Sequence, residues 1–142
     1  MRRVLGTVLS STVLLTGALL LTGCGSDSTP GASASATPAP EDVTTSPAAV
    51  KTGLTQLVTI SAGIQADVSD KTKATAGYAS IEPIWSTIEG TVKKNDADAY
   101  LALEDAFALL KNAAENGDST KAASGAGAVK TTVTSYLAKY PA

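Results

Sequence analysis

Large apolar residues recur every three or four positions from Pro47 to the end of the chain, which is the spacing of one face of a helix. Four such stripes follow one another, and short polar or glycine-containing stretches separate them. Their members are Val50, Leu54, Leu57, Ile64 and Val68; Ala74, Tyr78, Ile81, Trp85, Ile88 and Val92; Tyr100, Leu103, Phe107, Leu110 and Ala114; and Ala122, Ala126, Val129, Val133, Tyr136 or Leu137, and Tyr140. No segment shows the alternation of a strand. The pattern predicts an all-α fold, an up-down-up-down four-helix bundle over residues 47–142.

Residues that favour helix ends lie between the stripes. We expect N-caps at Ser46, within residues 95–98 and at Asp118-Ser119, a turn over residues 67–70, a C-cap at Asn116-Gly117 and a stop at Pro141. Pro83 interrupts the second stripe, and proline removes a backbone donor inside a helix. We therefore expect a kink there, around which the helix continues or restarts.

The first 23 residues have a different character. Met1-Arg2-Arg3 is positively charged, an apolar run follows from Val4 to Leu21, and small residues come next, which is typical of a secretory signal peptide. A transmembrane helix is the alternative, because the run is about the minimum length for a span. Two glycines and several Ser and Thr interrupt it, however, and a polar stretch follows. This pattern favours the signal peptide.

The segment ends in Leu21-Thr22-Gly23-Cys24, and this box resembles the lipobox of bacterial lipoproteins. The resemblance implies removal of residues 1–23 and a covalent lipid, such as palmitate, on the sulfur of Cys24. It also implies an extracytoplasmic protein that is lipid-anchored to the bacterial cell membrane. Two or more acyl chains anchor a protein stably, whereas one chain binds only marginally.

Residues 24–46 are rich in Ser, Thr, Ala and Pro and contain one large apolar residue after the cysteine, Val43. Such a composition buries too little apolar surface to offset the entropy of ordering the chain. We expect a disordered tether that separates the helical module from the membrane.

Composition excludes several classes of function. Without residues 1–23 the chain has 9 Lys against 13 acidic residues and no basic patch, so we expect no nucleic-acid partner. Histidine is absent and Cys24 is the only cysteine. A Cys/His zinc site, a disulfide and a Ser-His-Asp or Cys-His nucleophile pair are therefore excluded. We expect no enzyme, and any metal site needs oxygen ligands.

Three acids lie beside the predicted core. Glu82, Glu89 and Glu104 occupy equivalent positions on the flanks of the second and third stripes, near Tyr78 and Tyr100. Carboxylates with tyrosine phenolates form a hard, anionic ligand set that suits Fe(III). The alternative is that these acids pair with lysines or face water, and that the tyrosines belong to the core.

The stretch from Tyr78 through Ile81-Glu82-Pro83 and Trp85 to Glu89-Gly90 resembles a helix of imelysin/EfeO-type iron-uptake lipoproteins. It is also similar to the extracytoplasmic helical part of high-affinity iron permeases. Residues 100–105 resemble the second element of those proteins, and the resemblance is sharpest over residues 74–110. It implies that Glu82, Glu89 and Glu104 contact a metal. The chain lacks the His-x-x-Glu motif of imelysin-type domains and the Arg-Glu-x-x-Glu motif of the permeases.

Two hypotheses about function follow. In the first, the module binds Fe(III) or presents it to a membrane iron permease. In the second, it binds no metal and docks another envelope protein through a groove between helices, with an exposed apolar patch around Trp85 or along the fourth helix.

Overall fold

The computed structural model describes residues 44–142, and every regular element in this range is a helix. The helices are α1 (Pro47–Ala66), α2 (Lys71–Ala79), α3 (Glu82–Asn95), α4 (Ala97–Asn116) and α5 (Ser119–Lys139). The predicted all-α class is thus confirmed for this part of the chain. The predicted signal peptide, Cys24 and all but the last residues of the tether lie outside the described residues. None of the described helices has the length and apolarity that a membrane span requires.

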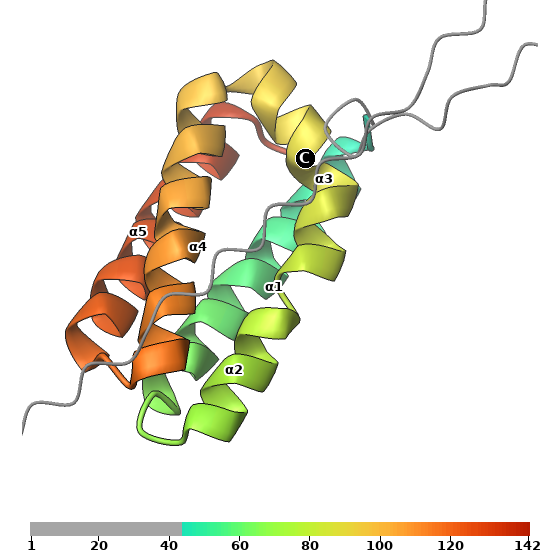
Figure 1. Cartoon of the computed structure of the whole chain (residues 1–142). Coiled ribbons are helices and arrows are strands. Elements are labelled where there is room, and N and C mark those ends of the chain that lie inside the picture. Colours follow the sequence, from blue (N-terminus) through green and yellow to red (C-terminus); the bar gives the residue numbers. More distant parts are fainter. Residues whose placement is uncertain (1–43) are drawn as a thin grey trace, which may run out of the picture. The chain divides into compact units, whose positions relative to one another are not determined.

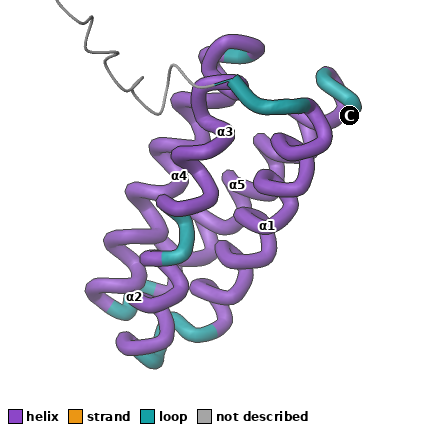
Figure 2. The backbone as a smooth tube through the Cα atoms, turned by 90° about the vertical axis from the view of Figure 1, so that its right-hand side faces the viewer, coloured by secondary structure: helices purple, strands orange, loops and turns teal. Residues whose placement is uncertain are grey.

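The helices pack side by side (Figure 1). α1 contacts α5 on one flank and α2 and α3 on the other, while α4 contacts α5 and, on its other flank, α2 and α3. Figure 2 shows α2 and α3 one after the other, with a short loop between them. α1 begins and α5 ends at the same end of the module (Figure 1).

The break between α2 and α3 is the restart expected at Pro83. Just before the break, the hydrogen bonds change from the α-helical to the tighter 3₁₀ spacing. The N–H groups of Ser80 and Ile81 bond to the carbonyls three residues earlier, at 3.1 and 3.0 Å. Pro83 then lies in the first turn of α3, where its missing N–H costs nothing. The N–H of Trp85 bonds to the carbonyl of Ile81 at 2.9 Å and begins the new helix.

The other predicted helix ends are confirmed. The side chains of Ser46, Asp96 and Asp118 each accept a bond from a backbone N–H in the first turn of the helix that follows. Gly117 ends α4 in the left-handed region at φ 71°, which favours glycine. The backbone N–H groups of the first turn lower the pKa of the Asp118 carboxyl below its ordinary value, because they stabilise the carboxylate.

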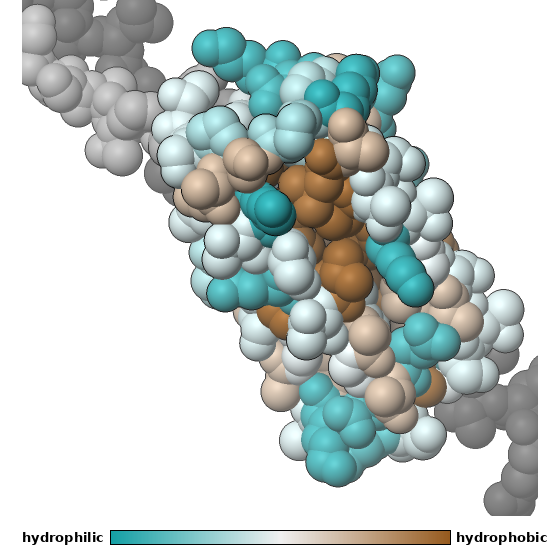
Figure 3. All heavy atoms as spheres, turned by 180° about the vertical axis from the view of Figure 1, so that it is seen from behind, coloured by the Kyte–Doolittle hydropathy of each residue, from teal (hydrophilic) through white to brown (hydrophobic). Residues whose placement is uncertain are grey.

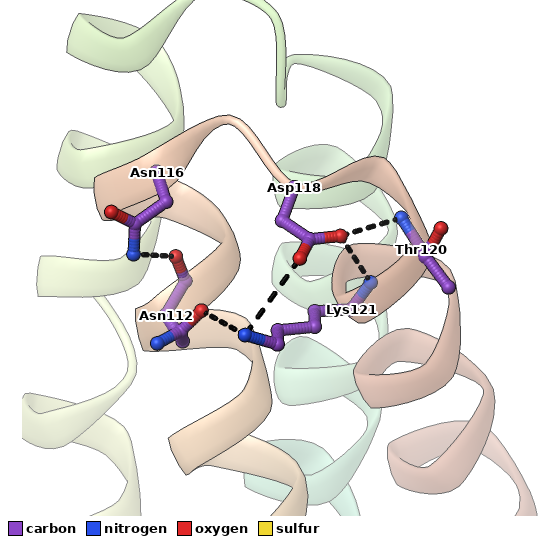
Figure 4. A network of polar contacts seen from close by, with 5 residues as sticks. All are labelled: Asn112, Asn116, Asp118, Thr120 and Lys121. Atoms are coloured by element: carbon purple, nitrogen blue, oxygen red, sulfur yellow. Dashed lines mark hydrogen bonds and ion pairs between the residues drawn. The ribbon is translucent and has the colours of Figure 1, made fainter.

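A polar network joins the end of α4 to the start of α5 (Figure 4). The carboxylate of Asp118 accepts bonds from the backbone N–H groups of Thr120 and Lys121, both at 3.0 Å. The ammonium of Lys121 donates to the Asn112 side-chain oxygen at 2.7 Å and lies 3.7 Å from the Asp118 carboxylate. The amide of Asn116 donates to the Asn112 carbonyl. The turn is therefore held by side chains from both helices.

Besides a small cluster of Val68, Ala113 and Ala122, one apolar core runs through the module and receives side chains from all five helices. The stripes predicted from the sequence supply it, with Tyr78, Tyr100, Leu137 and Tyr140 half-buried at its edge. Its largest fully buried side chains are Leu54, Leu57, Ile64, Ile88, Leu103, Leu110, Val92 and Val129.

Two glycines let helices approach closely within this core. A Cβ at Gly125 of α5 would lie 2.9 Å from Leu110 Cγ and 3.0 Å from the Ala106 carbonyl oxygen of α4. A Cβ at Gly53 of α1 would lie 2.9 Å from Ile88 Cδ1 of α3. Gly127, two residues from Gly125, faces open space. Gly125 is therefore needed for the close approach of α5 to α4, whereas Gly127 is not.

We predict that Gly125→Ala lowers the free energy of unfolding by about 1–3 kcal/mol, because the added methyl meets the backbone of α4. Gly127→Ala is the matched control and should raise it by about 0.5–1 kcal/mol through helix propensity alone. Urea denaturation of both variants measures the difference. A Gly125→Ala variant as stable as Gly127→Ala would contradict the close contact.

Candidate functional site

Trp85 is the centre of the contact between α3 and α4. Its side chain is only 2% exposed. The indole N–H donates to the Glu104 carboxylate at 2.5 Å, the ring stacks on Tyr100 with centroids 5.8 Å apart, and Phe107 meets it edge-on at 5.3 Å. The predicted partner surface around Trp85 is therefore wrong, because these contacts on α4 bury the indole.

Tyr100 and Glu104 both have structural partners in this contact. Lys93 places its ammonium 5.2 Å from the centroid of the Tyr100 ring, a cation–π geometry. Glu104 accepts the only N–H that a tryptophan side chain offers, so its carboxylate satisfies a buried donor. The structure thus gives these two predicted ligand residues a role in holding α3 against α4.

Tyr78 lies near the end of α2 and is half-buried against the core. Burial raises the pKa of its phenol above the ordinary value, and the charges of Glu82, Glu104 and Glu115 raise it further, while Lys111 lowers it. Tyr78 therefore remains a neutral phenol at neutral pH.

The structure brings together only some of the predicted metal ligands. Tyr78 lies within electrostatic range of Glu82 and Glu104, whereas Glu89 lies half-exposed in the middle of α3. Within residues 44–142, no three side chains of the types Asp, Glu, His and Cys are grouped closely enough to hold a metal ion.

A cleft that the sequence did not predict lies where α1 begins and α3 and α5 end. Its volume is about 300 Å³, at the lower limit for ligand pockets. Apolar parts of its wall come from Pro47, Val50 and Pro141, and the aromatic part comes from Tyr136 and Tyr140. Three polar side chains complete the lining: Thr91, Asn95 and Lys139.

Hydrogen bonds hold the aromatic wall of this cleft. The Asn95 side-chain amide donates to the Tyr136 hydroxyl at 2.9 Å, and the Tyr140 hydroxyl donates to the Asn95 carbonyl oxygen at 2.5 Å. The two rings lie 4.9 Å apart and are tilted by 42°. Burial raises the pKa of the Tyr136 phenol, so it stays protonated. Both tyrosine hydroxyl groups are therefore hydrogen-bonded to Asn95 at the end of α3.

Two further features lie at the rim of the cleft: the Lys139 ammonium and the backbone of Thr45, just before α1. The Lys139 ammonium bonds to the Asp96 carboxylate at 2.9 Å and lies 5.2 Å from the centroid of the Tyr140 ring. This ammonium holds the pKa of Asp96 below its ordinary value. On another side, the backbone N–H of Thr45 donates to the Thr91 hydroxyl oxygen at 2.7 Å. The residue just before the N-cap of α1 is thus held at the cleft.

The signal that could have revealed the cleft is the pair Tyr136 and Tyr140, one turn apart at the end of the last stripe. Tyrosines at a core edge keep one polar end near water. Their partner Asn95 is 41 residues from Tyr136 and 45 from Tyr140 in sequence, so only the fold reveals the arrangement.

Other surface features are shallower. A groove between α1 and α3 is lined by Gly53, Pro83 and Ile84 among others. Figure 3 shows apolar atoms gathered on the face seen from behind, between paler and more polar ones. Leu101 of α4, 58% exposed, is the one large apolar side chain classed as exposed in residues 44–142.

A scan against protein-family models, a search of curated proteins and a search of solved structures each return no match for this chain.

Proposed function

We propose that the chain is a lipoprotein of the bacterial envelope. Residues 1–23 direct export and are removed, a lipid on Cys24 anchors the mature chain, and residues 24–46 connect this anchor to the helices. The support is the order of the charged start, the apolar run and the box Leu21-Thr22-Gly23-Cys24. The anchored module has the topology of an up-down-up-down four-helix bundle in which α2 and α3 together form the second helix.

Mass spectrometry of the chain purified from bacterial membranes tests the anchor. We expect a mature N-terminal peptide that begins at Cys24 and carries acyl chains, because a single chain binds too weakly for stable anchoring. Cys24→Ser should abolish the modification and lead to accumulation of the uncleaved precursor. An unmodified Cys24 in the mature protein, or a mature N-terminus elsewhere, would contradict the proposal.

The module itself acts by docking a protein outside the membrane and has no catalytic role in this proposal. The observation that carries it is the cleft between the start of α1 and the ends of α3 and α5. Its aromatic wall is held by bonds from Tyr136 and Tyr140 to Asn95, so a ligand meets preorganised side chains and loses less entropy on binding. The chain has no histidine, and its single cysteine is assigned to the anchor.

A photo-crosslinking amino acid placed in the full chain tests this docking function. Introduced at Pro141, which lines the cleft, it should give one discrete product with an envelope protein on irradiation of cells. The matched control is the same residue at Leu101, which is 58% exposed on α4 and outside the cleft. Equal products from both positions, or none from position 141, would contradict docking at the cleft.

A second candidate function is the binding of iron for a membrane permease. The feature in its favour is that Tyr78, Glu82 and Glu104 come from three different helices, yet both acids lie close enough to Tyr78 to raise the pKa of its phenol, together with burial. An Fe(III) ion there would have to use the Glu104 carboxylate, which accepts the bond from the Trp85 indole. Trp85 is the only tryptophan and is therefore a direct reporter of this site.

Titration of the mature chain with ferric nitrilotriacetate tests the iron site through Trp85 fluorescence. Binding at Glu104 should quench the emission saturably, and Ca²⁺ should have a weaker effect because a phenol–carboxylate set favours Fe(III). Glu82→Gln/Glu89→Gln should weaken the response, and Asp105→Asn, an exposed neighbour of Glu104, should leave it unchanged. A missing response, or one unaltered by the double substitution, would contradict iron binding.

A further inference from the structure

The cleft adjoins the point where the tether reaches the helices. Thr45 bonds to Thr91 twice, through its N–H at 2.7 Å and its carbonyl oxygen at 3.4 Å. Thr91 is one of only two buried polar side chains in the part of the chain that the structure describes. The backbone just before α1 is thus fixed to a residue that lines the cleft.

The chemistry of the cleft selects a particular kind of segment. The Tyr140 hydroxyl bonds to Asn95, which leaves the half-buried Tyr140 ring and the exposed apolar atoms of Pro47 and Pro141 for a ligand. Tyr136 and Val50 form the floor of the cleft and are buried in the core. Aromatic-lined grooves of this kind bind proline-rich segments, because a polyproline II conformation is extended and already restricted before binding. Lys139 adds a cation at the edge.

The chain itself contains a matching segment close to the cleft. Residues 37–41 are Thr-Pro-Ala-Pro-Glu, with two prolines followed directly by an acid. Four residues, 41–44, lie between Pro40 and Thr45. An extended chain covers up to about 3.3–3.6 Å per residue, so the segment can turn back over the cleft. A short connection of this kind gives an effective concentration on the order of millimolar.

We propose that the cleft binds residues 37–41 of its own chain, with Pro38 and Pro40 against the Tyr140 ring and the prolines of the rim, and Glu41 near the Lys139 ammonium. This inference deepens the docking function and rests on it, because it names the class of ligand: an extended segment with spaced prolines and a following acid. A protein partner that uses the cleft has to displace the chain's own segment. The tether then acts both as a spacer and as an internal competitor.

Nuclear magnetic resonance of residues 24–142 with Cys24→Ser, expressed without residues 1–23, tests the proposal. The signals to follow are the Asn95 side-chain amide and the backbone amides of Thr91 and Tyr140. We expect Pro38→Ala/Pro40→Ala to shift all three, although the substitutions are more than 50 residues away in sequence. Pro30→Ala is the control in the same tether and should leave them unchanged. A synthetic peptide of residues 35–43, added to the double variant at about millimolar concentration, should reverse the shifts.

Each remaining outcome overturns the proposal in a different way. Cleft signals that neither the double substitution nor the peptide moves would show that the segment does not bind. Signals that depend on protein concentration would identify a second copy of the chain as the occupant. Binding of the added peptide without any effect of the double substitution would leave the cleft as a site for segments of other proteins only. Crosslinking from position 141 judges the docking function separately, since an internal segment gives no product of higher mass.

Discussion

The contact of Trp85 with α4 determines where the second half of the module lies. α3 begins anew at Glu82, after the helical hydrogen bonds of α2 have ended, so its position depends on what it packs against. The indole sits between Tyr100 and Phe107 and donates to Glu104. These contacts set the register of α3 along α4. Thr91 and Asn95, further along α3, are thereby placed beside α1 and α5, where they form the cleft.

Local interactions explain the part of this fold that sequence analysis predicted. The caps at Ser46, Asp96 and Asp118 depend on residues within one turn, and the left-handed Gly117 depends on its own backbone. The periodicity of the stripes likewise reports which face of each helix is buried. These features are determined by residues close together in the sequence. The all-α class and the helix ends could therefore be predicted.

The remaining features depend on contacts between distant residues. Trp85 and Glu104 are 19 residues apart, and heptad positions indicate only that one faces the core and the other its edge. Asn95 and Tyr136 are 41 apart, and Thr45 and Thr91 are 46 apart. Which side chains meet across a module is set by the register of whole helices. For this reason the bond of Glu104 to the indole could not be predicted from the sequence.

The two ends of the module that meet at the cleft also determine how it would bear mechanical load. The first turn of α1 and the last turn of α5 lie at one end, and the bond from Thr45 to Thr91 fastens the backbone there. A pull on the preceding residues, opposed by a partner held at Tyr140, would act between two points a short distance apart. Such a pull loads the contact between α1 and α5 from one end, so the bond from Thr45 to Thr91 and the first turn of α1 would open before the contacts further along these helices.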